Sequence, residues 1–358
     1  MQIARLFAAL ALGAAATAAA QNAPMTGTQG DYVVHNFTFT TGEVFPELRL
    51  HYTTLGTPRR DAGGVVRNAV MILHGTGGTG RAFLSATYAG VLFGPGQLLD
   101  TARYYIVLPD GVGHGGSSKP SDGLHARFPK YTYDDMVHAQ HALLTQGLGV
   151  NHLRLVMGTS MGCMHAWVWG YMYPDFADGL VPLACVPAPI VGRNRMMRKM
   201  IMDDITTDPG YHGGDYTVQP RGVIAASQLL FMMTSAPLVQ QRMAPTREAA
   251  DSQITAYLAN RARVTDANDM LYQFDASRDY DPSPHLAQVT APVLAINTAD
   301  DQVNPPELGI VERLMPQVAK GKFLLLPITP QTRGHGTHSL PAVWGGYLAD
   351  FLKGLPER

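Results

Sequence analysis

The sequence predicts an α/β fold in which a mostly parallel β-sheet carries helices on both faces. Short apolar runs alternate along the chain with segments of helical periodicity, which is the pattern of successive βα units. Two of these runs, Val70–Leu73 and Tyr104–Leu108, are almost wholly apolar, as expected for strands buried on both sides. A third, Leu153–Met157, leads into a glycine-flanked turn, Gly158–Gly162, and then into a helical stretch, Cys163–Tyr173.

The bulk composition describes a well-filled globular chain. Its 358 residues, 46% hydrophobic and 15% charged, suffice for one large domain or for a core with an insertion. The formal net charge of −1 gives no reason to expect nucleic acid or an anionic membrane surface as a partner. We therefore expect neither partner.

The first 20 residues have the layout of a secretory signal peptide. Arg5 supplies a positive charge, Leu6–Ala16 is a short apolar run, and Ala18–Ala20 offers a cleavage site before Gln21. The apolar run is too short to span a bilayer, although an uncleaved N-terminal anchor is the alternative. We expect residues 1–20 to be removed and the mature chain to be periplasmic or secreted, without a stable membrane anchor.

The remaining elements fit the same fold. We expect the first two strands of the chain to pair antiparallel and the later ones to continue the parallel sheet. The further expected strands are Tyr32–Thr40, Leu48–Thr54, Leu180–Cys185, Pro292–Ile296 and Phe323–Leu326, and the further expected helices are Tyr133–Leu148 and Ser339–Leu352.

The alternation of strands and helices stops in the middle of the chain. Residues 21–186 and 286–358 are predicted to form the α/β core, and residues 187–285 a helical insertion without a strand partner. Insertions over the edge of such a sheet serve as active-site lids. The methionines of this segment are expected to be flexible core or the adaptable wall of an acyl pocket.

The two cysteines, Cys163 and Cys185, could form one disulfide in an oxidising compartment. We expect them instead to be two buried thiols, because one lies in a helix and the other near the end of a strand. Neither has the spacing of a metal site, and the sequence contains no other Cys/His cluster with that spacing. We expect no metal and no cofactor.

The turn around Ser160 resembles the nucleophile elbow of α/β-hydrolases, which implies a catalytic serine. A serine hydroxyl needs a base to take its proton and a carboxylate to orient that base. In this fold the acid follows a late strand, which leaves Asp300 and Asp301 as candidates. We choose Asp301, because hydrolases of this fold commonly place a proline four residues after the acid, and Pro305 fits. Asp300 is the alternative.

The base is expected in the loop between the last strand and the last helix. His335 and His338 both lie there. We choose His335, because a Gly-His pair at this position is the habit of the fold. His338 is the alternative base, and otherwise caps the helix or lines the pocket.

Two backbone amides must hold the negative charge that develops on the substrate oxygen. One should be the amide of Met161, directly after the serine. The other should be the amide of Thr76, in the glycine-rich loop that follows Val70–Leu73. His74 in this loop is expected to be structural and not a second base.

Three blocks resemble the homoserine O-acetyltransferase group of α/β-hydrolases. Ser160–Trp167 is similar to that group's S-M-G-G-M-Q-A-L elbow, Tyr133–Gln140 to its D-M-V-x-x-Q helix, and Asp208–Tyr216 to its D-P-x-W-x-G-G-D-Y segment. The resemblance covers most of the mature chain. It implies a Ser-Asp-His enzyme with a helical lid that often mediates dimerisation, so a homodimer through the lid is expected.

The sequence departs from that group where homoserine would bind. Ser227 stands in the place of a lid arginine that holds the amino-acid carboxylate, and Gly336 in that of an aspartate near the amine. Asp110–Ser118 resembles instead the D-x-x-G-x-G-x-S loop of general ester hydrolases. An exported enzyme would also have little access to acetyl-CoA, which is a cytosolic cofactor.

We therefore predict an exported serine hydrolase that cleaves a small-molecule carboxylic ester, with water as the acyl acceptor. The alternative is an acyltransferase that moves the acyl group to an alcohol or amine acceptor other than homoserine. A third possibility, from a different class, is a binding protein that keeps the fold without turnover.

Overall fold

The computed structural model describes residues 25–356, so the expected signal peptide at residues 1–20 lies outside the described residues. Its strands form one eight-stranded sheet in the order β1-β2-β4-β3-β5-β6-β7-β8. The strands are β1 (Thr28–Thr38), β2 (Val44–Leu55), β3 (Ala69–Leu73), β4 (Tyr105–Pro109), β5 (Leu155–Thr159), β6 (Leu180–Leu183), β7 (Val293–Thr298) and β8 (Gly321–Leu326).

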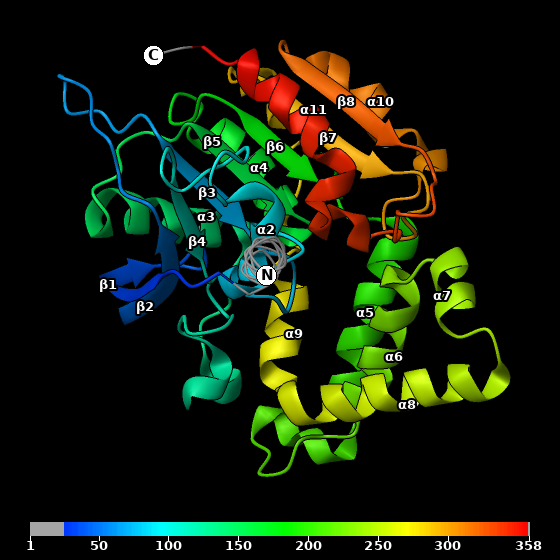
Figure 1. The fold of residues 1–358 in the computed structure, drawn as a ribbon. Coiled ribbons are helices and arrows are strands. Elements are labelled where there is room, and N and C mark those ends of the chain that lie inside the picture. Colours follow the sequence, from blue (N-terminus) through cyan, green and yellow to red (C-terminus); the bar gives the residue numbers. More distant parts are fainter. Residues whose placement is uncertain (1–24, 357–358) are drawn as a thin grey trace, which may run out of the picture.

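The sheet is antiparallel at one edge and parallel elsewhere. β2 pairs antiparallel with both β1 and β4, and every other neighbouring pair in the sheet is parallel. This confirms the α/β-hydrolase fold, with its mostly parallel sheet, that the sequence predicted (Figure 1). Parallel strands bring their carboxyl ends to one edge, and that edge is where loops from distant parts of the chain can meet.

Helices cover both faces of this sheet. The α-helices are α2 (Ala89–Leu92), α3 (Tyr133–Ala142), α4 (Met161–Met172), α5 (Gly192–Thr206), α6 (Gly222–Thr234), α7 (Pro237–Met243), α8 (Arg247–Val264), α9 (Ala267–Asp275), α10 (Ile310–Leu314) and α11 (Pro341–Lys353). The helix expected over Tyr133–Leu148 is confirmed to within one residue, although only Tyr133–Ala142 of it is α-helical. The chain continues as a π-helical turn, Leu143–Gly147, in which the Leu148 amide bonds the Leu143 carbonyl five residues back.

Alternate side chains of β3 show how the two faces are buried. Met71 belongs to the apolar cluster that includes α3 and α4, whereas Val70 and Ile72 belong to the cluster on the opposite face. Trp344 of α11 is fully buried in that second cluster. Because successive residues of a strand point to opposite faces, a strand covered on both sides must be apolar throughout.

Everything between β6 and β7 that forms regular structure is helical, and we call α5–α9 (residues 192–275) the helical insertion. Figure 1 shows α5–α8 standing away from the sheet as a separate layer. The insertion has an apolar cluster of its own, to which Ile201, Ile205 and Val223 contribute. Its methionines differ in exposure: Met197 is buried in this cluster, whereas Met200 is exposed to solvent.

Between residues 25 and 356, no single helix is long and apolar enough to cross a membrane. The pair α6 and α7 passes that test only when the two helices are joined, and they are bent by 106° at their break.

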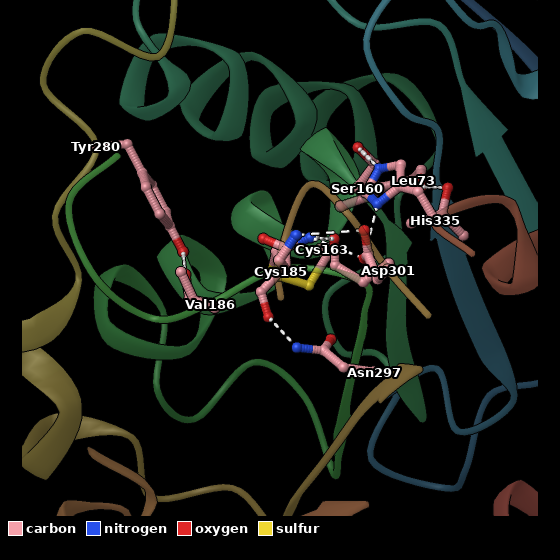
Figure 2. Close-up of a disulfide and its surroundings, with 12 residues drawn as sticks. Leu73, Ser160, Cys163, Cys185, Val186, Tyr280, Asn297, Asp301 and His335 are labelled. Carbon is pink, nitrogen blue, oxygen red and sulfur yellow. Dashed lines mark hydrogen bonds and ion pairs between the residues drawn. A yellow bond between two sulfur atoms is a disulfide. The ribbon is translucent and has the colours of Figure 1, made fainter. Parts of the chain in front are cut away.

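The two cysteines form a disulfide, so the expectation of two free buried thiols was wrong. The Cα atoms of Cys163 and Cys185 are 5.9 Å apart, and their sulfur atoms are bonded (Figure 2). Cys163 lies in the first turn of α4, and Cys185 lies two residues beyond β6, the neighbour of β5 in the sheet. Pairing of β5 with β6 therefore places two residues of different elements in contact, which their separation in sequence does not reveal.

We predict that this disulfide stabilises the folded chain by about 3 kcal/mol, the chain-entropy value for a loop of this length. The cysteines are 22 residues apart in the sequence. The measurement is urea unfolding of the oxidised protein, of the reduced protein, and of the Cys163→Ala/Cys185→Ala double variant. The reduced protein and the variant should unfold at similar, lower urea concentrations. Coincident curves for all three would contradict the predicted stabilisation.

Candidate active site

Ser160 lies at the sharp turn between β5 and α4, where its backbone has φ 54° and ψ −110°. A positive φ strains a residue that carries a Cβ, at a cost of about 1–3 kcal/mol. The flanking glycines make the turn sterically possible. A Cβ at Gly158 would overlap the Gly162 carbonyl, and a Cβ at Gly162 would overlap the Leu73 carbonyl. The Gly-x-Ser-x-Gly pattern is therefore a packing requirement of this turn.

Backbone hydrogen bonds fix the turn to the strands on either side. The Ser160 amide donates to the Leu183 carbonyl at the end of β6 (2.9 Å). The Gly162 amide donates to the His74 carbonyl, just beyond β3 (3.0 Å). The serine hydroxyl is consequently held at the carboxyl edge of the sheet, where the loops after β3, β7 and β8 also lie.

The structure brings together the serine, histidine and aspartate that the sequence singled out first. His335 Nε2 lies 2.8 Å from Ser160 Oγ, and His335 Nδ1 lies 2.9 Å from Asp301 Oδ2 (Figure 2). Asp301 is 0% exposed and His335 6%. With Nδ1 protonated toward the carboxylate, Nε2 is free to accept the serine proton, which is the arrangement that general-base activation of a serine requires.

Asp301 remains ionised in this buried place. Burial by itself raises the pKa of its carboxyl, but the charge of His335 and hydrogen bonds from His335, Asn304 and Val303 outweigh burial and lower the pKa below its ordinary value. The amides of Val303 and Asn304 donate to Oδ1, at 2.8 and 3.2 Å, and the Asn304 side chain donates to Oδ2 (3.1 Å). A charged Asp301 fixes the orientation of the histidine ring.

The two alternates occupy supporting positions. Asp300 accepts a hydrogen bond from the Gly334 amide (3.0 Å), so it holds the loop that carries His335. The ring of His338 lies 5.3 Å from that of His335, centroid to centroid. Burial, and then the charge of His335, lower the pKa of His338 to about 3. His338 is therefore neutral, and within residues 25–356 it makes no hydrogen bond to an aspartate.

The glycine-rich loop after β3 runs directly beside the serine. A Cβ at Gly75 would lie 3.2 Å from Ser160 Cβ and 3.8 Å from Ser160 Oγ. The Thr76 amide follows Gly75, and the Met161 amide begins α4. Across the described part of the chain, neither of these two amides donates a hydrogen bond to a protein group. Both remain available to a substrate oxygen, which is what stabilisation of an oxyanion requires.

His74 supports this loop. Its Nε2 accepts a hydrogen bond from the Gly111 amide (2.9 Å), and its Nδ1 lies 2.9 Å from the Gly75 carbonyl. Burial lowers the pKa of His74. Both ring nitrogens are thus occupied by the backbone, as the structural role predicted for it requires.

Two cavities meet at the serine. One, of about 570 Å³, lies along the Gly75–Thr76 loop and reaches His338; the other, of about 400 Å³, is walled by apolar residues that include Met164 and Ile190. Four residues line both cavities: Ser160, Arg198, Val303 and His335. Two pockets that share a nucleophile suit a substrate with two parts, one on either side of the bond that reacts.

The two positions at which the sequence departs from the acetyltransferase pattern, Ser227 and Gly336, differ in whether they line a cavity. Ser227 is fully buried in α6, and its hydroxyl donates to the Val223 carbonyl (2.7 Å). Ser227 lines neither cavity, whereas Gly336 lines the larger one. In the described residues, no group of three or more His, Cys, Asp or Glu side chains is placed to hold a metal ion.

Sequence reasoning missed Arg198, a cation in the wall of both cavities. The spacing of α5 carried the signal. Met197, Ile201 and Ile205 are its buried face, and Arg198 stands three residues before Ile201 on the same side. A charged residue inside an apolar helical stripe indicates a buried group with a specific task.

The comparisons with known proteins agree with the fold. The alpha/beta hydrolase fold family matches residues 68–213. A homoserine O-acetyltransferase of Moorella thermoacetica is 31% identical over 307 residues, which cover 74% of this chain and 79% of that protein.

Solved structures share the fold over almost the whole chain. The homoserine O-acetyltransferase of Bacillus anthracis has a TM-score of 0.81 at 21% identity, covering 93% of this chain and 99% of that one. An acetylester hydrolase of Corynebacterium glutamicum has a TM-score of 0.79 at 20% identity, covering 91% and 96%. Identities this low show a common fold and nothing finer.

We predict that matched substitutions will separate the first-choice residues from their alternates. Asp301→Asn should lower kcat by about 10³- to 10⁴-fold, because an amide favours the wrong histidine tautomer. Asp300→Asn should change it far less, since Asp300 bonds only the loop backbone. His335→Ala should likewise abolish turnover, whereas His338→Ala should retain most of it. Rates are compared at equal folded fraction, with 4-nitrophenyl acetate. A reversed order in either pair would assign the role to the alternate.

Proposed function

Because this chain belongs to the homoserine O-acetyltransferase group of the α/β-hydrolase superfamily, we propose that it is an exported serine hydrolase that cleaves a carboxylic ester. The observation that carries the proposal is the continuous chain of hydrogen bonds from Ser160 through His335 to Asp301. Family membership alone leaves the reaction open, since the group's fold hosts both esterases and acyltransferases.

In the proposed mechanism Ser160 Oγ attacks the acyl carbon while His335 Nε2 takes the serine proton. Asp301 stabilises the resulting imidazolium, and the amides of Met161 and Thr76 hold the oxyanion, each contributing about 2.7–4 kcal/mol. His335 then gives the proton to the leaving alcohol, which leaves the acyl group on Ser160. A water molecule, deprotonated by His335, attacks the acyl-enzyme. The bond between the acyl carbon and Ser160 Oγ then breaks, His335 returns the proton to Oγ, and the acid leaves.

Water is proposed as the acceptor because contacts for homoserine are lacking at the positions the family uses. Ser227 is bonded back to its own helix and lines neither cavity, so it holds no carboxylate. Gly336 offers no side chain to an amine. The runner-up, transfer to an alcohol or amine acceptor, is favoured by the name of the acetyltransferase relative and shares the same acyl-enzyme.

Export is proposed from the N-terminal pattern, and the disulfide supports it. Disulfides persist in a periplasm or outside the cell and are rare in a reducing cytosol. Cys163 lies three residues after the nucleophile, so an oxidising environment would stabilise the elbow itself.

The central test of hydrolysis is the fate of the acyl group. We expect Ser160→Ala to lower turnover of 4-nitrophenyl acetate by at least about 10³-fold without moving the thermal unfolding midpoint. In the wild type with millimolar methanol or ethanol added, we expect acetate as the main product. An unchanged rate in the variant would end the mechanism. Dominant transfer to the alcohol at low concentration would establish the acyltransferase alternative instead.

The export proposal predicts a mature chain that begins at Gln21. The measurement is the intact mass and N-terminal sequence of the protein recovered from periplasm or medium. A chain lacking residues 2–20 should stay in the cytoplasm and, when purified there, should contain reduced cysteines. Recovery of the full-length chain from membranes would identify the N-terminus as an uncleaved anchor.

A further inference from the structure

Arg198 is a buried cation beside the reacting serine. It projects from α5 of the helical insertion, is 4% exposed, and lines both cavities that meet at Ser160. Burying a guanidinium is costly unless an anion compensates its charge. A guanidinium this deeply buried is therefore expected to have an anionic partner.

The protein partners of Arg198 are all neutral. Its Nε donates to Asn194 Oδ1 and its Nη1 to Ser277 Oγ, both at 3.0 Å, and its guanidinium carbon lies 5.5 Å from the centre of the Phe274 ring. No Asp or Glu among residues 25–356 forms an ion pair with it. A fully buried arginine is normally paired with an anionic group.

The nearby tyrosine does not supply the missing charge. Burial raises the pKa of Tyr133, although the positive charge of Arg198 and hydrogen bonding partly oppose the rise. Tyr133 is thus a neutral hydroxyl at physiological pH. The positive charge of Arg198 stays uncompensated by the protein.

The guanidinium of Arg198 has more donors than its protein partners use. It carries five N–H groups, of which the bonds to Asn194 and Ser277 use one on Nε and one on Nη1. A hydrogen bond to the Tyr133 hydroxyl uses at most one more. At least two N–H groups on Nη1 and Nη2 therefore have no acceptor among residues 25–356. Two adjacent donors of this kind match the two oxygens of a carboxylate.

We propose that Arg198 binds a carboxylate of the substrate, so that the preferred ester is an anionic one. This inference rests on the proposed ester hydrolysis at Ser160. The carboxylate belongs either to the acyl part or to the alcohol part of the ester, because Arg198 borders both cavities. In either case the substrate supplies the anion that the protein lacks, and the pairing orients the reacting carbonyl beside Ser160.

The test compares anionic and neutral esters of nearly equal size. One pair is monomethyl and dimethyl glutarate, which places the carboxylate on the acyl part, with methanol release as the readout. The other is acetoxyacetate and its methyl ester, which places it on the alcohol part, with acetate release as the readout. In one pair we expect wild-type kcat/KM to be at least tenfold higher for the anion.

Three variants assign that preference to Arg198. Arg198→Met should lower kcat/KM for the preferred anionic ester at least tenfold and leave its neutral partner within threefold. Arg198→Lys should restore part of the preference, because it keeps the charge but loses the paired donors. Arg195→Met is the matched control: Arg195 is a half-buried cation on the same helix that lines neither cavity, and its loss should leave the ratio unchanged.

Several outcomes would overturn the inference. A higher wild-type kcat/KM for the neutral ester in both pairs would do so. An equal loss of kcat/KM for anionic and neutral esters in Arg198→Met would also do so, because it would indicate that Arg198 only holds α5 against Ser277. In those cases turnover of neutral esters would leave the proposed hydrolysis standing. If the wild type turned over neither pair and no simple ester, both proposals would fall together.

Discussion

The strained backbone of Ser160 is the constraint on which the rest of the site depends. A positive φ is unfavourable for serine. The conformation persists because Gly158 and Gly162 pack closely against the backbone, and because two backbone hydrogen bonds hold the turn to the neighbouring strands. The same turn aims the hydroxyl at His335 and starts α4, whose first amide, that of Met161, has no acceptor in the described part of the chain. The disulfide of Cys163 adds a covalent tie one turn further on. Strand order, turn and site are thus parts of one arrangement.

Two buried charged side chains near the serine, Asp301 and Arg198, differ in how far the protein compensates their charges. Asp301 is surrounded by donors from His335, Val303 and Asn304, so the protein alone satisfies it. Arg198 meets only neutral groups, lines both cavities and keeps donors that no group among the described residues accepts. A fully compensated charge serves to orient another residue, whereas an uncompensated one is a place for a ligand. This contrast divides the site into a part that performs the reaction and a part that selects the substrate.

The parts of the structure that depend on local pattern were predictable from the sequence. Apolar runs located the buried strands, and the glycine pattern located the elbow, because sterics require both. The order of strands in the fold limited the acid to Asp300 or Asp301 and the base to His335 or His338, and resemblance to hydrolases of this fold chose Asp301 and His335. The disulfide was mispredicted, because contact between α4 and the end of β6 depends on how neighbouring strands pair. The helical spacing of α5 signals that Arg198 is buried, but its place beside Ser160 was missed because the path of the helical insertion over the sheet edge has no local signature in the sequence.

The central claim about this enzyme is that the acyl group is transferred first to the oxygen of Ser160. The most direct measurement is peptide mass spectrometry of the wild-type protein quenched in acid during turnover of 4-nitrophenyl acetate. The account predicts an added acetyl group on Ser160, accumulating in the first turnover and disappearing when substrate is exhausted. Steady product formation with that serine unmodified, or with acetyl on another residue, would contradict it.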